Sequence, residues 1–307
     1  MLNSWKVIIN PNAGGKSDAA QWEQIYNQLR NAGLQFHSEL SNYHKHSIEI
    51  VHAAINKGYR NFIVVGGDGS LNEAVNGFYT QSMVSPTELT LAQLPLGTGN
   101  DWQKTHNPAA TIEETIQRIK IGKFALQDVG LAQYYDASDA KKNYFANVAG
   151  MGFDAYVVVR TNRKKDKKAR SKFAYLFNLF TSLMSYKCVT TQVSIDGQKV
   201  FADKLFSFNV GIGKYNGGGM MQVPDAITDD GLLDVTLFKK ISKIKVVANV
   251  KRLYDGSFRT LKEVSLYRGR ELEIISEDVL NLECDGETLG HTPVSFSIIP
   301  LGLRYIC

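Results

Sequence analysis

Phe62-Ile63-Val64-Val65-Gly66-Gly67-Asp68-Gly69-Ser70 is the stretch of sequence that decides the fold. Its first four residues form an unbroken apolar run, which is typical of a strand buried on both faces of a parallel sheet. The glycines end that strand, and a helix is predicted to begin at Ser70. A buried strand, a glycine-rich turn and a helix in this order predict one βα unit of an open parallel sheet.

The same order recurs on both sides of this unit. Apolar or alternating runs predict strands at residues 5–10, 34–40 and 89–94, and helices are predicted between them. Ser17 or Asp18 can cap the first helix, and the capping box Thr111-Ile112-Glu113-Glu114 opens a helix that Gly122 closes. We therefore predict an α/β domain with a parallel sheet over residues 1–127.

From Phe124 onward the sequence changes to short strands separated by turn signals. These signals are Asp196-Gly197, Asp230-Gly231, Arg268-Gly269 and Asp285-Gly286. Two helical stretches, at about 171–186 and 242–255, interrupt the strands. Residues 128–299 are predicted to form a second, mostly antiparallel domain.

Composition narrows the class of protein. The chain has 307 residues, of which 44% are hydrophobic and 21% charged, so two globular domains are expected and a disordered chain is excluded. Its three cysteines are an odd number without CxxC spacing, which argues against a disulfide framework or a zinc site. Neither a signal segment nor an apolar run of about 20 residues is present, so we expect a cytoplasmic protein.

The first glycine-rich loop follows the first predicted strand and reads Asn10-Pro11-Asn12-Ala13-Gly14-Gly15-Lys16-Ser17. It ends like a Walker A loop, but Asn10 stands where that motif requires its first glycine, so a standard P-loop is rejected. The paired glycines still allow the backbone to approach a phosphate, and Lys16 adds a cation. A simple turn between strand and helix is the alternative.

The second loop is Gly66-Gly67-Asp68-Gly69-Ser70-Leu71-Asn72-Glu73. Its small residues allow close backbone approach to a ligand, and its aspartate can bind Mg²⁺ on phosphates. Asp68 is also a suitable N-cap for the following helix, although capping alone does not require a double glycine. The third loop, Pro95-Leu96-Gly97-Thr98-Gly99-Asn100-Asp101, again follows a strand. Three such loops at successive strand ends predict a nucleotide site.

These loops resemble the soluble diacylglycerol and sphingosine kinase family, which is related to NAD kinases and 6-phosphofructokinases through the GGDG loop. The resemblance extends to Phe145-Ala146-Asn147, Gly150-Met151-Gly152-Phe153-Asp154, Asp229-Asp230-Gly231-Leu232-Leu233-Asp234 and Asp285-Gly286-Glu287, in the family's order. It covers nearly the whole chain. One departure is Ser70, where the family usually has threonine, and the hydroxyl is kept.

The resemblance implies a two-domain molecule with ATP in the cleft, an NAD kinase/phosphofructokinase-like α/β domain first and a β-sandwich-like lipid-substrate domain second. It also implies that residues 300–307 return to the first domain. The nucleotide contacts that it implies are Asn10, Pro11, Asn12, Ala13, Gly14, Ser41, Gly66, Gly67, Asp68, Gly69, Ser70, Leu71, Asn72, Glu73, Gly97, Thr98, Gly99, Asn100 and Asp101.

Phosphoryl transfer requires positioning, charge neutralisation and a base near the attacking hydroxyl. Asp68 and Asp101 are our candidates for organising catalytic Mg²⁺. By resemblance Glu287 accepts the proton of the lipid hydroxyl, held beside Asp285 on a tight turn. From the residues alone, Asp285-Gly286 is equally a plain hairpin turn that leaves Glu287 as a solvated strand residue.

The resemblance also implies a second, structural Mg²⁺ site. Its ligands would be the Asp230 carboxylate and the backbone carbonyls of Ile227 and Leu232, a set of oxygen atoms that suits Mg²⁺. The alternative is a turn with surface acids.

The basic residues are concentrated in one segment. Residues 160–172 hold eight Lys or Arg and one acid, whereas the whole chain has a net charge of +5. Arg163–Lys172 leads into the apolar stretch that begins at Phe173, a pattern typical of contact with an anionic membrane surface. The alternative is a run of charged residues that is simply exposed to solvent. A nucleic-acid contact is disfavoured because no nucleic-acid-binding motif accompanies the charge.

Together these features predict an ATP-dependent kinase that phosphorylates the hydroxyl of a membrane lipid such as diacylglycerol, working transiently at the inner membrane surface. Its rivals are an NAD kinase-like enzyme with a soluble dinucleotide acceptor and an ATP-binding relative without catalysis. The acceptor lipid and the oligomeric state, a homodimer included, are left open by the sequence.

Overall fold

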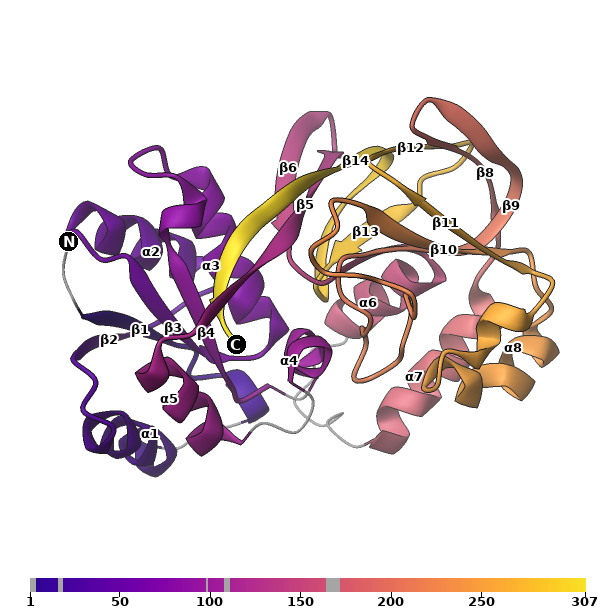
Figure 1. The fold of residues 1–307 in the computed structure, drawn as a ribbon. Coiled ribbons are helices and arrows are strands. Elements are labelled where there is room, and N and C mark those ends of the chain that lie inside the picture. The colour runs from indigo at the N-terminus through magenta and orange to yellow at the C-terminus, as the bar shows by residue number, and fades with distance from the viewer. Residues whose placement is uncertain (1–3, 16–18, 98, 108–110, 164–171) are drawn as a thin grey trace. The chain divides into compact units, whose positions relative to one another are not determined.

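The computed structural model describes residues 4–15, 19–97, 99–107, 111–163 and 172–307 (Figure 1). The chain divides into two compact units, each described here by itself. Unit 1 consists of Met1–Val129 with Ile299–Cys307, and unit 2 of Gly130–Ile298. Two long strands, β5 (Phe124–Asp136) and β14 (Glu287–Ile306), contribute residues to both units.

Unit 1 is built on a parallel sheet in the order β14-β4-β3-β1-β2. Its strands are β1 (Trp5–Ile9), β2 (Phe36–Leu40), β3 (Asn61–Gly66), β4 (Thr90–Pro95) and the end of β14, where Arg304 and Tyr305 pair in parallel with β4. Phe62 to Val65 of β3 are fully buried, as expected for a central strand with both faces covered.

Helices cover both faces of this sheet. They are η1 (Ala13–Gly15), α1 (Ala19–Asn31), α2 (His46–Asn56), α3 (Asp68–Thr80), η2 (Pro86–Glu88), α4 (Asp101–His106) and α5 (Ile112–Ile121). Apolar side chains of α1 and α5 share one core cluster with β1, β3 and β4. On α3, Phe78 packs edge-on against Phe62 of the sheet. The α5 capping box is confirmed, since Thr111 Oγ1 accepts the Glu114 amide at 3.2 Å.

Unit 2 is mostly antiparallel, in the order β11-β10-β9-β7-β13-β14, with β8 between β9 and β12, and with β12 and β5 also paired to β14. Its remaining strands are β6 (Asp139–Phe145), β7 (Val148–Gly152), β8 (Val189–Ile195), β9 (Gln198–Gly211), β10 (Leu233–Lys239), β11 (Val264–Gly269), β12 (Glu271–Ser276) and β13 (Asn281–Cys284). Apolar side chains from these strands form its main core.

The helices of unit 2 form a second apolar cluster against β9 and β10. They are α6 (Phe153–Arg163), α7 (Lys172–Ser185), α8 (Lys243–Asn249), η3 (Val250–Leu253) and η4 (Ser257–Thr260). This cluster includes Phe153, Leu183, Phe206, Phe238 and Phe258. None of the helices in the described part of the chain is long and apolar enough to cross a bilayer.

The predicted fold class, an α/β domain followed by a mostly antiparallel domain, is confirmed. Two details differ from the prediction. Helix α3 begins at Asp68, two residues early, because the extended backbone of Gly67 already takes the N-cap position. Helix α6 was not predicted. Gly152, at φ 80°, ends β7 and turns the chain directly into this helix.

Candidate functional site

The three glycine-rich loops of unit 1 come together at the carboxyl ends of β1, β3 and β4. A Cβ atom at Gly97 would lie 2.5 Å from the Cα of Gly67, and one at Gly14 would lie 2.5 Å from the Leu96 carbonyl oxygen. Side chains at these positions would force the loops apart. The glycines are therefore required by loop-to-loop contact, and the backbone of all three loops is concentrated at one edge of the sheet.

Polar side chains tie the loops to one another. Asn10 Nδ2 donates to Ser70 Oγ at 3.0 Å, and Asn10 Oδ1 accepts the amide of Asn12 at 2.9 Å. The third loop is closed by Asn100, which exchanges hydrogen bonds with the backbone of Gly97 at 2.9 and 2.8 Å. The loop backbone is thus held in place by the side chains of Asn10, Ser70 and Asn100.

Asp68 and Asp101 place two carboxylates side by side. A Cβ atom at Gly99 would lie 2.9 Å from Asp68 Oδ2 and 3.3 Å from Asp101 Oδ2. Asp68 accepts the Trp102 amide at 3.1 Å, and Lys104 pairs with Asp101 at 2.8 Å. Burial, and then the neighbouring Asp101 charge, raise the pKa of Asp68. Two neighbouring carboxylates, one buried and one partly buried, offer oxygen ligands of the kind that Mg²⁺ takes, whereas Lys104 is a cation and not a ligand.

The other predicted nucleotide residues lie around these loops. Ser41 is buried, and its hydroxyl donates to the Ile9 carbonyl at 3.3 Å. Leu71 and Asn72 are buried within α3, and the Leu71 amide bonds to the Gly67 carbonyl inside the helix. The Glu73 carboxylate accepts the amides of Lys45 and Ser47 at the start of α2. Thr98 lies outside the described residues.

In unit 2, Asp285 and Gly286 form the tight turn between β13 and β14, both with positive φ. Asp285 is 3% exposed, and its carboxylate accepts the amides of Ala146, Asn147 and Val148, each at 3.1 Å. This carboxylate fixes the turn against the start of β7. Glu287, the first residue of β14, is half-buried and pairs across the turn with Cys284.

Glu283 was not predicted from the sequence, although it lies two residues before Asp285. It is fully buried, and it accepts the Gly286 amide at 2.9 Å and Asn216 Nδ2 at 2.8 Å. Burial raises the pKa of Glu283 to about 8. The turn that carries Glu287 is therefore held by two buried carboxylates, Glu283 of β13 and Asp285 of the turn itself.

Gly150 joins this turn to a second polar cluster. A Cβ atom there would lie 2.5 Å from Glu283 Oε1, 3.2 Å from Asn209 Oδ1 and 3.4 Å from the Asp154 Cβ. Only glycine leaves room for these three side chains around one backbone position. The quoted GMGFD motif thus brings the start of α6 next to the β13–β14 turn.

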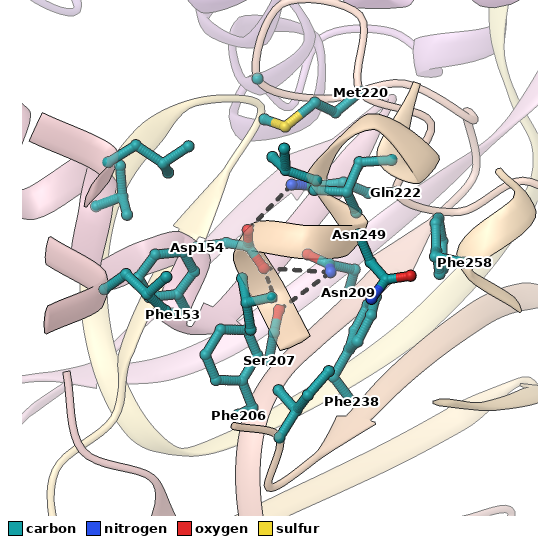
Figure 2. Close-up of a pocket in the computed structure, with 18 of the residues that line it drawn as sticks. Phe153, Asp154, Phe206, Ser207, Asn209, Met220, Gln222, Phe238, Asn249 and Phe258 are labelled. Atoms are coloured by element: carbon teal, nitrogen blue, oxygen red, sulfur yellow. Dashed lines mark hydrogen bonds between the residues drawn. The ribbon is translucent and has the colours of Figure 1, made fainter. Parts of the chain in front are cut away.

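Asp154 is the centre of that cluster (Figure 2). Its carboxylate accepts a short hydrogen bond from Ser207, one from Asn209 at 3.3 Å and one from Gln222 at 3.1 Å. Burial raises the pKa of Asp154. Asn209 Oδ1 and Gln222 Oε1 are buried without a hydrogen-bond partner among the described residues.

An apolar cavity of about 250 Å³ opens above these polar groups. Its polar floor is Asp154, Ser207, Asn209 and Gln222, and aromatic rings surround that floor in Figure 2. The remaining lining is almost wholly apolar and comes from α6, α7, β9, β10, α8 and the η3–η4 region. On the rim, Phe180 is 52% and Val247 47% exposed. The sequence did not reveal this cavity, because its lining is dispersed over more than 100 positions.

The predicted metal loop is held by an arginine. Asp230 pairs with Arg268 and accepts the Leu232 amide at 3.2 Å, while the Ile227 amide donates to Asp234 at 3.4 Å. Arg268 also pairs with Asp234 at 2.7 Å. A guanidinium already supplies the positive charge beside Asp230, so these residues do not fit a further cation as they are arranged. The Mg²⁺ site there stays a prediction.

Most of the predicted membrane segment, residues 164–171, lies outside the described residues, and its membrane contact stays a prediction. Among described residues, no group of three or more His, Cys, Asp or Glu side chains is arranged to hold a metal. The Asp68–Asp101 pair has two members, and ATP phosphates would have to complete any coordination there.

Comparison with known proteins identifies both units. Residues 4–132 match the diacylglycerol kinase catalytic domain, and residues 147–307 match the YegS C-terminal NAD kinase β-sandwich-like domain. The chain is 26% identical over 259 residues to a Mycobacterium tuberculosis protein named diacylglycerol kinase, covering 83% of this chain and 79% of the relative. It is 29% identical over 303 residues to a Xanthomonas euvesicatoria protein named probable lipid kinase YegS-like, covering 98% and 94%.

Solved structures share the fold. A diacylglycerol kinase structure from Bacillus anthracis matches with a TM-score of 0.71 and 20% identity over 99% of this chain and 96% of that one. An NAD kinase from Archaeoglobus fulgidus, in complex with ATP, matches with a TM-score of 0.54 and 12% identity over 99% and 93%. The family models and the named relatives confirm the resemblance seen in the sequence. The chain belongs to the family that joins a diacylglycerol kinase catalytic domain to a YegS C-terminal NAD kinase β-sandwich-like domain.

Proposed function

We propose that the protein is an ATP-dependent lipid kinase that transfers the γ-phosphate of ATP to the hydroxyl of a membrane lipid such as diacylglycerol. The observation that carries this proposal is the apolar cavity of unit 2, which has a polar floor next to the turn bearing Glu287. A soluble dinucleotide carries several charges and hydroxyls, and burying these in an apolar cavity is costly. The cavity therefore favours a lipid acceptor over NAD.

Unit 1 would bind the nucleotide. The loop backbone held by Asn10, Ser70 and Asn100 offers amides and close approach to phosphates. Asp68 and Asp101 would hold Mg²⁺ on the phosphates, and the ion would neutralise charge that builds up on the transferred group. The raised pKa of Asp68 has the expected direction for two carboxylates awaiting a cation.

Unit 2 would bind the acceptor. Glu287 is our candidate for taking the proton of the lipid hydroxyl as its oxygen bonds to phosphorus. Asp285 would act as a positioning residue, because its carboxylate is occupied by three backbone amides. The exposed apolar rim at Phe180 and Val247, with the basic segment Arg163–Lys172 nearby in sequence, would reach the lipid at an anionic membrane surface.

The test is transfer of label from γ-labelled ATP, with Mg²⁺, to dioleoylglycerol in mixed micelles, with NAD as the soluble comparison. We expect label in the lipid with the wild-type protein and at least a hundredfold less with Glu287→Gln. Glu273→Gln, an exposed strand residue in the same unit, is the matched control and should transfer normally.

Label in NADP alone would identify an NAD kinase instead. ATP binding without transfer to any acceptor would identify a relative that has lost catalysis. Membrane docking is tested separately by flotation with vesicles that contain or lack anionic lipid. Charge reversal of Lys164, Lys165, Lys167 and Lys168 should abolish any preference for the anionic vesicles, whereas an unchanged preference would leave the basic segment as a solvated charge run.

A further inference from the structure

The floor of the unit 2 cavity contains two buried acceptor atoms that the protein leaves unused. Asn209 is 1% and Gln222 4% exposed, and both line the cavity. Asn209 Oδ1 and Gln222 Oε1 have no hydrogen-bond partner among the described residues. A buried polar atom without a partner costs free energy, so its presence beside a cavity requires an explanation.

The amide nitrogens of the same side chains both bind Asp154. Gln222 Nε2 donates to Asp154 Oδ1 at 3.1 Å, and Asn209 Nδ2 donates to Asp154 Oδ2 at 3.3 Å and to Ser207 Oγ at 3.2 Å. These bonds to Asp154 fix which way each amide faces. The unpartnered oxygens are therefore held in place as acceptors, and a ligand group that satisfies them must be a hydrogen-bond donor.

The cavity also has a direction. Its buried end is polar and adjoins Glu283 and the Asp285–Gly286 turn through Gly150, whereas its rim at Phe180 and Val247 is apolar and exposed. A lipid would enter with its polar end first and leave its chain towards the rim. Its hydroxyl would then lie at the end of the cavity that adjoins the turn bearing Glu287.

The size of the cavity limits how much chain it holds. A cavity of about 150 Å³ accommodates one benzene molecule, and this one is about 250 Å³. It has room for a small polar group and a short length of one hydrocarbon chain. The rest of the lipid would leave through the exposed rim.

We propose that Asn209 and Gln222, oriented by Asp154, recognise a second hydrogen-bond donor next to the hydroxyl that is phosphorylated. This inference rests on the proposed lipid kinase function and names its acceptor class. The preferred acceptor is a lipid with two adjacent donors, either two hydroxyls or a hydroxyl and an ammonium group. Diacylglycerol, which has one free hydroxyl and no second donor, is a poorer substrate.

The test compares an acceptor that has the second donor with one in which a methyl group replaces that donor hydrogen. A 1-O-alkylglycerol carries free hydroxyls at carbons 2 and 3, and its 2-O-methyl ether keeps the chain and the primary hydroxyl but loses the donor. With the full chain, γ-labelled ATP and mixed micelles, we expect kcat/KM to be about 10- to 100-fold higher for the diol. The kcat/KM for sphingosine, as a third acceptor, shows whether an ammonium group can replace the second hydroxyl as the donor.

Substitutions in the cavity floor test whether Asn209 and Gln222 cause the preference for the diol. Gln222→Met removes the unused oxygen together with the amide bond to Asp154, and the ratio between diol and ether should fall towards one. Asn209→Leu is a second route to the same result if the first variant does not fold. Gln192→Met, on the exposed face of β8, is the matched control and should keep the wild-type ratio.

Each outcome separates this inference from the function on which it rests. Equal rates for diol and ether in the wild-type protein would overturn the donor recognition and leave the lipid kinase function standing. A wild-type preference that survives in both Gln222→Met and Asn209→Leu would overturn the assignment to these residues. No label in any lipid would overturn the proposed function itself.

Discussion

The two candidate sites of this protein are built in opposite ways. In unit 1 the site consists of backbone and small residues, gathered from three short loops at neighbouring strand ends. In unit 2 it consists of buried side chains from α6, β9, β13 and the loop before β10. The difference follows from the ligands that we propose. A phosphate is held by amides and needs close approach, whereas a lipid needs an apolar volume that only distant segments enclose.

The largest effect is expected at Asp68. The site of unit 1 consists mainly of backbone, so it should depend strongly on the few side chains that it has. Asp68→Asn removes one of two adjacent carboxylates and should lower kcat by about 10²- to 10³-fold, because charge on the transferred phosphate is then less well neutralised. Steady-state kinetics with ATP and a lipid acceptor measure it. Asp278→Asn, on an exposed loop of unit 2, should be silent. A loss below fivefold would remove Asp68 from the catalytic group.

The next effect tests whether the loops of unit 1 need their close contact. Gly97→Ala places a Cβ atom 2.5 Å from the Gly67 Cα, which separates the second and third loops. The KM for ATP should rise about 10- to 100-fold. At Gly197, in the β8–β9 turn, a Cβ meets no atom within 4 Å, but φ is +76°. Gly197→Ala should therefore cost about 1 kcal/mol of stability and leave the KM unchanged. Equal KM values for both variants would show that ATP binding does not depend on the close contact between the loops of unit 1.

A pH experiment probes the buried carboxylates of unit 2. Burial raises the pKa of Glu283 in the folded protein to about 8 from its ordinary value of 4.5, so the folded state keeps a proton that the unfolded state has lost. Stability should fall as pH rises between these values, by about 1.4 kcal/mol per pH unit at most. Glu283→Gln removes the part of this slope that Glu283 contributes. Urea unfolding at pH 6 and 7.5 measures it, and parallel curves for wild type and variant would refute the assignment.

The smallest effect concerns the Asp230 loop. Arg268→Leu leaves Asp230 and the buried Asp234 without their cation, and we expect a loss of about 1 kcal/mol, since Arg268 is partly exposed. Arg259→Leu breaks an exposed pair with Asp225 and should cost less than about 0.5 kcal/mol. Because Arg268 supplies the positive charge, EDTA and Mg²⁺ should not shift the wild-type Tm. A clear rise in Tm with Mg²⁺ would support the metal site that the sequence predicts.

Local patterns in the sequence determined much of unit 1. The apolar run at Phe62–Val65 predicted a buried parallel strand, and the glycines after β1, β3 and β4 marked the loops that meet there. Such predictions succeed because the carboxyl ends of parallel strands lie at the same edge of the sheet. Each loop motif can also be recognised from a few consecutive residues. The capping box at Thr111 is another local signal that the structure confirms.

Only the tertiary structure decided the site of unit 2. Ser207 and Asn209 lie in the apolar strand β9, and their two-residue spacing places both on one face, but nothing in the sequence links them to Asp154 or Gln222. Glu283 looks like an ordinary strand residue until its burial is known. The helix α6 was missed because its start depends on the Gly152 backbone and not on a capping side chain. Burial and long-range contacts are properties of the folded chain, so the polar floor, the cavity and the arginine beside Asp230 could not be predicted from local patterns.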